Sequence, residues 1–291
     1  MPSKPANEPG DKKTPGTLFL VGTPIGNLSD LSLRALDTLR QVDGIAAEDT
    51  RRTRKLLSHY DIRKPLISCH AHNEVQRSAE LLQRLIEGEK LALVTDAGTP
   101  GISDPGAYLV GRAIEAGIPV SVIPGPAALI AALAASGLST HPFAFLGFAP
   151  ARGPNRRKFF ASHASLPMTL VLYESPKRLC RTLEDILDWW GDRKVCVARE
   201  LTKIHEEFFR GRIREAVERY RVEPKGEITL VVSGFEGKEG PAREETQWRA
   251  RLREILLESG MGVGEASAII AREYGLPKRV VYREALKQRE S

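Results

Sequence analysis

Cysteine, aromatic residues and long apolar runs are all scarce in this sequence. Its cysteines number three, and such an odd, widely scattered set excludes a disulfide framework and fits a reducing compartment. No segment approaches the roughly 18 consecutive apolar residues of a membrane span, and the first residues lack the apolar core of a secretion signal. These absences predict a cytoplasmic protein without a membrane-spanning segment.

The composition is that of a globular protein that is too long for one compact core. Hydrophobic residues make up 42% and charged residues 27% of the 291 positions, so enough apolar surface can be buried to offset the entropy of ordering the chain. Single cores stop growing near this length, which favours two medium-sized domains and a small appendage. Residues 1–15 combine prolines and lysines without apolar periodicity, and we expect a disordered tail there.

From Thr17 onward, short β-rich runs alternate with helical segments, and this alternation predicts an α/β fold with a parallel sheet. Apolar residues spaced for a helix occupy 31–40. We also expect Asn73 and Gln76 to cap a second helix, and Asp104 to cap another that starts at Pro105. The strands of this first domain are predicted at 17–22, 44–47, 66–69, 91–95 and 120–123.

The pattern changes between residues 132 and 142, where an alanine-rich helix ends at Ser136 and Gly137. We therefore predict an N-terminal α/β domain at 16–138 and a C-terminal α/β domain at 139–236. A polar linker at 236–245 then leads into a small helical domain at 243–291 that resembles a helix-turn-helix. In the second α/β domain, strands are predicted at 143–147, 168–173, 194–199 and 228–233, with helices near 176–190 and 212–220.

Three loops that follow predicted strands are rich in glycine and proline, and they lie at 22–28, 96–106 and 124–127. One such loop would be ordinary turn punctuation, but three at the ends of strands in one sheet predict a shared pocket. None matches the glycine patterns of dinucleotide or Walker phosphate sites, and none contains a basic residue. The pocket should therefore hold its ligand through main-chain groups and carboxylates, with Asp96 as a polar anchor or as a cap of its own loop.

Positive charge gathers in two places, although the net charge is only +6. One cluster includes Arg51 and Arg52, and the other includes Arg152, Arg156, Arg157 and Lys158 beside two phenylalanines, where the pattern suggests a basic, aromatic loop. Both clusters are candidates for RNA contacts, and solvated helix faces are the alternative interpretation. No metal is expected, because His70 and His72 lack further ligands at metal-binding spacing.

The ordered motifs of the chain resemble the tetrapyrrole methylase superfamily, whose members bind S-adenosylmethionine in the cleft between two α/β domains. Within it, the chain is most similar to the ribosomal RNA small-subunit methyltransferase I family, from about Thr17 to the end. The motifs that carry the resemblance are 22–28, Ala-Glu-Asp-Thr-Arg at 47–51, 70–74, 96–106, 169–176 and Arg-Glu-Leu-Thr-Lys at 199–203.

The resemblance implies 2′-O-methylation of a cytidine in the decoding region of 16S ribosomal RNA, with the RNA or the small ribosomal subunit as partner. It also implies a homodimer. The positions that correspond to the family's S-adenosylmethionine contacts are Pro24, Gly98, Thr99, Ile102, Ser103, Ala127, Tyr173 and Ile228, with Asp96 as the added anchor.

Methyl transfer to a ribose hydroxyl needs in-line positioning and a group that accepts the proton. Our candidates for that group are Glu48, Asp49, Glu174 and Glu200. Arg51 or Lys203 would orient the ribose or stabilise its oxygen. Glu48 and Asp49 follow a strand and point to opposite sides, so only one of them can face the cleft. Ion pairs with Arg51 and Arg52 are the alternative role for these two carboxylates.

Two other functions compete with this interpretation. The first is methyl transfer to another acceptor of the superfamily, such as a corrin precursor or a protein. The second is a non-catalytic RNA-binding role in ribosome assembly, for which failure to bind S-adenosylmethionine would be the sign.

Overall fold

The computed structural model describes residues 14–236, 248–249, 251–252, 254–256, 261–274 and 278–289. The chain divides into two compact units, Met1–Gly234 and Phe235–Ser291. The tail predicted at 1–15 and the linker predicted at 236–245 lie almost wholly outside the described residues. Each unit is considered by itself below.

The first sheet consists of five parallel strands, as the alternation of the sequence predicts. In spatial order they are β3 (Leu66–Ser68), β2 (Gly44–Ala47), β4 (Leu91–Val94), β1 (Leu18–Val21) and β5 (Val120–Ile123). The strands β2 and β4 are buried at every position, because helices cover both faces of the sheet. Parallel pairing places the carboxyl ends of all five strands at one edge.

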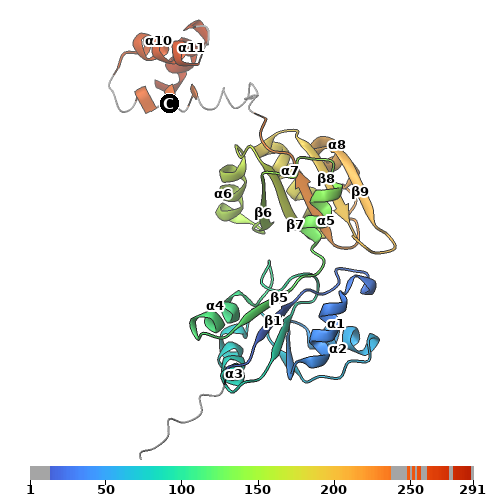
Figure 1. Ribbon diagram of the computed structural model, residues 1–291. Helices are drawn as coiled ribbons and strands as arrows, with labels where there is room; N and C mark the ends of the chain where they lie inside the picture. The colour runs from blue at the N-terminus through green and yellow to red at the C-terminus, as the bar shows by residue number, and fades with distance from the viewer. Residues whose placement is uncertain are drawn as a thin grey trace, which may run out of the picture. The chain divides into compact units, whose positions relative to one another are not determined.

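Helices α1 (Leu33–Gln41) and α2 (Thr50–His59) cover one face of this sheet, and α3 (Glu74–Ile86) and α4 (Ala107–Glu115) cover the other (Figure 1). In α1 the buried residues Ala35, Thr38 and Leu39 recur at helical spacing, and Ser32 caps the first turn by accepting a hydrogen bond from the Ala35 amide at 3.1 Å. A short 3-10 helix, η1 (Leu28–Asp30), ends the loop after β1.

The second sheet is mixed and has the order β6-β7-β10-β8-β9. Only β6 and β7 pair in parallel, and the remaining pairs are antiparallel. The strands are β6 (Phe143–Phe148), β7 (Thr169–Glu174), β10 (Ile228–Val232), β8 (Lys194–Arg199) and β9 (Glu207–Arg212). The edge strand β9 was not predicted, because its sequence Glu-Phe-Phe-Arg-Gly-Arg does not alternate cleanly between apolar and polar residues.

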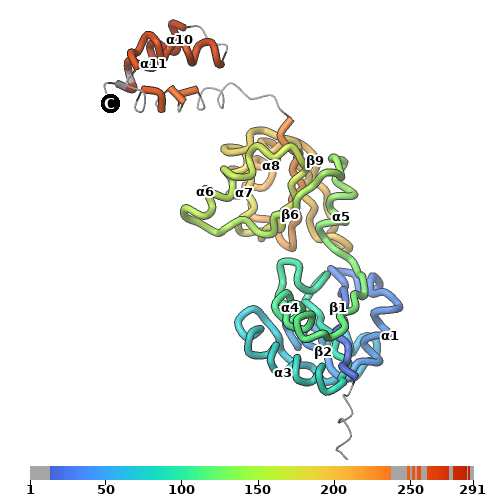
Figure 2. Tube along the Cα trace, turned by 60° about the vertical axis from the view of Figure 1, so that its left-hand side comes forward, coloured from blue at the N-terminus to red at the C-terminus, as the bar shows by residue number. Residues whose placement is uncertain are grey.

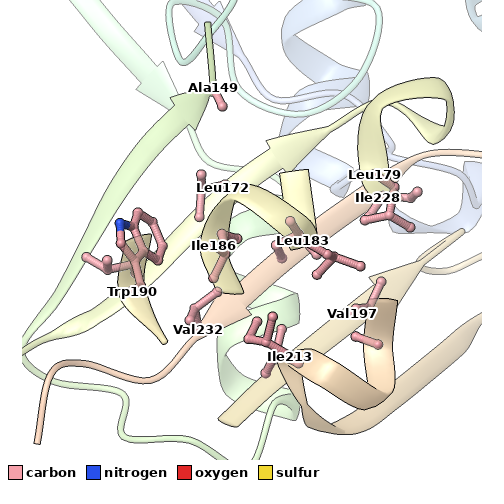
Figure 3. Close-up of a cluster of buried hydrophobic side chains, with 14 of the residues drawn as sticks. Ala149, Leu172, Leu179, Leu183, Ile186, Trp190, Val197, Ile213, Ile228 and Val232 are labelled. Carbon is pink, nitrogen blue, oxygen red and sulfur yellow. The ribbon is translucent and has the colours of Figure 1, made fainter. Parts of the chain in front are cut away.

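One face of the second sheet packs against α6 (Gly153–His163), α7 (Pro176–Trp190) and α8 (Ile213–Arg219), and the opposite face packs against α5 (Ala128–Ala135) (Figure 2). Figure 3 shows the first of these interfaces, where Leu183 and Ile186 of α7 meet Leu172 of β7 and Val232 of β10. Helix α5 thus belongs to the second sheet by its contacts, although the sequence grouped it with the first domain.

Three local predictions are wrong. Asn73 does not cap α3 with its side chain; its Oδ1 instead accepts the His70 amide at 2.8 Å, which holds the preceding turn. Asp104 does not cap α4, which begins at Ala107, because Glu74 Oε1 accepts the amides of Gly106 and Tyr108 there. The basic, aromatic segment 153–163 is the helix α6 and not a loop.

The second unit contains the predicted C-terminal helices. Helix α10 (Val263–Glu273) packs against α11 (Lys278–Arg289). Its small core joins these two helices to Trp248 and Leu252, which are 2% and 0% exposed. Helices are therefore present in the described part of the segment 243–291, as predicted.

Candidate functional site

The three glycine- and proline-rich loops converge at one edge of the first sheet, because they follow β1, β4 and β5, which are neighbours in it. The Thr23 amide donates to the Gly98 carbonyl at 2.8 Å and the Gly98 amide donates back at 3.1 Å, so the first two loops are paired. Gly22 and Gly125 bring the first and third loops together: a Cβ on Gly22 would lie 2.7 Å from Gly125 Cα. The predicted pocket of three loops is therefore formed.

A cavity of about 670 Å³ opens beside these loops, a size that is typical of small-molecule and cofactor sites. The loops contribute one part of its lining, and residues of β6, β7 and β10 contribute another. Its lining includes Ile25, Glu48, Arg52, Asp96, Gly98, Thr99, Ile102, Ser103, Asp104, Ala127, Phe148, Tyr173 and Ile228. Arg52 is the one basic residue among the lining residues, so the cavity offers little to a polyphosphate.

Carboxylates gather on the first-domain side of this cavity. Glu48 accepts a hydrogen bond from the Thr95 hydroxyl at 2.7 Å, and Asp96 accepts one from the Asp49 amide at 3.1 Å. Burial raises the pKa of Asp104 to about 6, against the opposing effect of the Thr95 hydroxyl, and the charges of Glu48 and Asp96 raise it further. Burial likewise raises the pKa of Asp96. The cavity is therefore complementary to a positively charged ligand.

The sequence did not identify Asp104 or the three phenylalanines of the cavity's aromatic wall, in which only Tyr173 was predicted. The pattern Asp-Pro before a helix suggested only a cap for Asp104. The wall consists of Phe143, Phe145 and Phe148 with Tyr173, whose ring centroid lies 4.8 Å from that of Phe145 and 5.7 Å from that of Phe148. An irregularity in the β6–β7 register lies between Phe145 and Phe148. The cluster of phenylalanines in 143–148 was the available signal.

A second, smaller cavity of about 280 Å³ adjoins the first and shares with it Ile25, Arg52, Asp96, Ala97 and Glu227. Arg52 Nη1 lies 3.2 Å from Asp96 Oδ2, so this ion pair lines both cavities. The second cavity also has Pro24 and Lys203 in its lining. Pro24 thus lies apart from the other positions expected to touch the cofactor, which all line the first cavity.

The segment 199–203 reaches the second cavity from the second domain. Lys203 Nζ lies 2.8 Å from Glu200 Oε1 and 3.0 Å from Glu227 Oε2. Burial opposes the charge of Lys203, but these two hydrogen bonds outweigh it and raise the pKa of its ammonium group. The hydrogen bond from Lys203 lowers the pKa of Glu200. Gly26 permits the approach, since a Cβ there would lie 2.6 Å from Lys203 Cγ.

Of the adjacent pair Glu48 and Asp49, only Glu48 lines the cavity, as the strand geometry predicts. Asp49 is the N-cap of α2 and accepts the Arg51 amide at 2.8 Å, while its other oxygen pairs with the Arg51 guanidinium at 2.8 Å. The side-chain bonds to Arg51 hold the pKa of Asp49 well below its usual range. The alternative role predicted for the pair, ion pairing with arginine, is confirmed for Asp49.

Glu174 is enclosed by the second domain. Its side chain is 0% exposed, and it accepts hydrogen bonds from the Ser175 amide at 2.7 Å, Arg178 Nε at 2.8 Å and the Thr182 hydroxyl at 2.6 Å. Although the residue borders the first cavity, its carboxylate is fully occupied by these donors. This arrangement suits a structural residue and not a proton acceptor.

The second basic cluster is divided by the structure. Arg156 is 3% exposed, with Nη2 2.5 Å from Asp185 Oδ2 and 3.0 Å from the Thr182 hydroxyl. Its guanidinium is therefore not free for an RNA phosphate, and we leave it out of the RNA contacts proposed below. Arg152, Arg157 and Lys158 are exposed on or beside α6.

No group of three or more His, Cys, Asp or Glu side chains placed to hold a metal occurs in the described part of the chain. None of the helices that the structure describes is long and apolar enough to cross a membrane.

Comparison with known proteins gives one family and several close relatives. The profile of the family described as Tetrapyrrole (Corrin/Porphyrin) Methylases matches residues 17–217. The chain is 47% identical over 273 residues to "Ribosomal RNA small subunit methyltransferase I" of Synechocystis sp., covering 93% of the chain and 98% of the relative. A protein of the same name from Thermotoga maritima is 52% identical over 222 residues, covering 76% of the chain and all of the relative, 100%.

Solved structures share the fold at much lower identity. Diphthine synthase matches with a TM-score of 0.60 and 14% identity, covering 75% of the chain and 90% of that structure. The uroporphyrin-III C-methyl transferase of Thermus thermophilus, complexed with S-adenyl homocysteine, matches with a TM-score of 0.55 and 21% identity, covering 74% and 97%. The chain therefore shares its two-domain α/β fold with these two proteins.

Proposed function

The chain belongs to the tetrapyrrole (corrin/porphyrin) methylase family, and on that premise we propose that it is an S-adenosylmethionine-dependent ribosomal RNA methyltransferase. More specifically, we propose that it methylates the ribose 2′-hydroxyl of a cytidine in the decoding region of 16S RNA. The RNA, free or in the small ribosomal subunit, is the partner, and the enzyme acts in the cytoplasm as a homodimer. The names of relatives that cover 93% and 76% of the chain support the RNA acceptor.

The cavity of about 670 Å³ is the observation that carries the proposal. S-adenosylmethionine has two cationic groups, a sulfonium and an ammonium, and no phosphate. A cavity with Asp96 and Asp104 on one side and a wall of aromatic rings on the other suits both the charges and the adenine of such a ligand. The ligand would also contact Gly98, Thr99, Ile102, Ser103, Ala127, Tyr173 and Ile228, which line the same cavity.

Glu48 is our proposed proton acceptor. In the reaction, the ribose oxygen forms a bond to the methyl carbon, the carbon–sulfur bond breaks with its electron pair going to sulfur, and the hydroxyl proton passes to a base. Glu48 lies in the cavity and accepts a hydrogen bond from the Thr95 hydroxyl and one at 3.4 Å from the Asp96 amide. By contrast, Asp49, Glu174 and Glu200 are each bonded to a cation outside the cavity or at its border.

RNA contacts are proposed for exposed basic residues that the structure leaves accessible. Arg52 lines both cavities, and Arg51 is on the same helix with 84% of its side chain exposed. Arg152, Arg157 and Lys158 would contact the RNA backbone farther from the reacting ribose.

The test is methyl transfer from labelled S-adenosylmethionine to small subunits and to 16S RNA, both taken from cells that lack the enzyme. We expect label in the RNA, and mass-spectrometric mapping should place it on a cytidine ribose in the decoding region. A corrin precursor serves as the competing acceptor. Label in the corrin alone, or no transfer to any of the three, would contradict the proposal.

A further inference from the structure

The smaller cavity lies where an acceptor must enter if the methyl donor fills the larger one. The two cavities share Ile25, Arg52, Asp96, Ala97 and Glu227, so ligands in them would meet beside these residues. Displacement at a methyl carbon requires the attacking oxygen to lie about 3 to 3.5 Å from it, in line with the departing sulfur. At about 280 Å³, the second cavity is just below the size of sites for whole drug-like ligands, which suits one fragment of a larger ligand.

Helix α2 places two cations on the wall of this cavity. Arg52, Lys55 and Leu56 lie on one face at helical spacing and all line it, whereas Arg51 and Arg54 lie on the neighbouring face and do not. Two of the three cations that line this cavity are already paired. Arg52 is held by Asp96, and Lys203 is held by Glu200 and Glu227.

Lys55 is the third cation of this lining. It is exposed, and no ion pair joins it to any residue that the structure describes. In RNA, the phosphate on the 3′ side is attached to the carbon next to the one that bears the 2′-hydroxyl. A cation beside the reacting hydroxyl therefore meets this phosphate first. Thr23, Thr53 and Thr95 also line the cavity.

We propose that the second cavity binds the acceptor ribose together with its 3′ phosphodiester, which Lys55 contacts, and that it is the subsite through which the RNA backbone is positioned for methyl transfer. The inference rests on the proposed function, because it assigns the acceptor of that reaction to a place in the protein. Lys55 is a positioning residue here, since it touches the backbone and not the reacting atoms.

The experiment compares Lys55→Ala with Lys55→Arg, which keeps the charge, and with Arg54→Ala, which removes the same charge from the neighbouring face of α2. Methyl transfer to unmethylated small subunits is measured as kcat/KM. Binding of a single-stranded oligoribonucleotide of the decoding-region sequence is measured by fluorescence anisotropy at several salt concentrations. Calorimetry with S-adenosylhomocysteine reports whether the larger cavity is intact.

We expect Lys55→Ala to lower kcat/KM about tenfold and to reduce the slope of log K against log salt by roughly 0.7, the value for one phosphate contact with a single strand. Lys55→Arg should recover most of the loss, and Arg54→Ala should change kcat/KM less than threefold. The affinity for S-adenosylhomocysteine should be unchanged in all three variants. Equal losses in Lys55→Ala and Arg54→Ala, or none in Lys55→Ala, would overturn the proposal. Wild-type protein that binds RNA through Lys55 but transfers no methyl group would instead overturn the proposed function.

Discussion

Two strands deliver a glutamate to the border of the larger cavity, β2 with Glu48 and β7 with Glu174, and the two carboxylates have different surroundings. Glu48 is half-buried and has a hydroxyl and one distant amide as donors. Glu174 is enclosed, with an amide, a hydroxyl and the guanidinium of Arg178 as donors. Both lie at the end of a strand beside the same cavity. Only Glu48 can still accept a hydrogen bond or a proton from a ligand. The number of donors around a carboxylate, and not its place after a strand, separates a chemical role from a structural one.

Removing the carboxylate of Glu48 is expected to have the largest effect. Glu48→Gln should lower the single-turnover rate of methyl transfer by about 100-fold to 10,000-fold, the usual contribution of a general base, with little change in thermal stability. Glu200→Gln is the matched control, because that carboxylate is bonded to Lys203 outside the larger cavity. A full rate in Glu48→Gln would contradict the role of Glu48 as proton acceptor.

The enclosed carboxylate should matter for folding instead. Glu174→Ala leaves Arg178 without its buried partner, and we expect the free energy of unfolding to fall by about 3 to 5 kcal/mol in urea titrations. The control is Glu218→Ala, whose pair with Arg221 is 59% and 68% exposed and should contribute less than about 1 kcal/mol. If the free energy of unfolding falls by the same small amount in both variants, the buried Glu174 carboxylate does not stabilise the fold more than an exposed ion pair does.

Asp104 is a third carboxylate near Glu48, and its charged form destabilises the fold. Its pKa in the folded protein, about 6, exceeds the ordinary 3.8, so the protonated form stabilises the fold at low pH and this contribution is lost as the pH rises through 6. Asp104→Asn removes the titration. The stability of the variant relative to wild type should therefore rise between pH 4 and pH 7 by about 1 to 2 kcal/mol, which allows for solvent screening of a half-buried group.

Urea unfolding of both proteins at the two pH values measures this change. A stability difference that stays constant with pH would show that Asp104 titrates normally in the fold.

Much of the first domain could be predicted because its strands are short, apolar and punctuated by glycine and proline. The strands at 44–47 and 120–123 were predicted to the residue. What could not be predicted is that β1, β4 and β5 are neighbours, since these strands are far apart in the chain. Their adjacency is what turns three separate loops into one cavity.

The segment 153–163 of the second domain was harder to predict because its apolar residues are not periodic. Helix α6 buries only Arg156 and Phe160, so it has no apolar stripe to distinguish it from a basic loop. For the same reason the sequence could not separate buried Arg156 from exposed Arg157: adjacent residues of one type differ only in which side of a helix they occupy. Burial and pairing, which decide between Glu48 and Glu174 too, depend on residues distant in sequence.

We propose that the larger cavity binds the methyl donor. Calorimetry with S-adenosylmethionine tests this directly when a larger side chain is introduced into the cavity. Ala128→Phe places a ring in the cavity from the start of α5, and Ala134→Phe adds the same ring at an exposed position of the same helix. We expect one binding site per chain in wild type and in Ala134→Phe, and loss of binding in Ala128→Phe. Equal binding by all three proteins, or no binding by wild type, would contradict it.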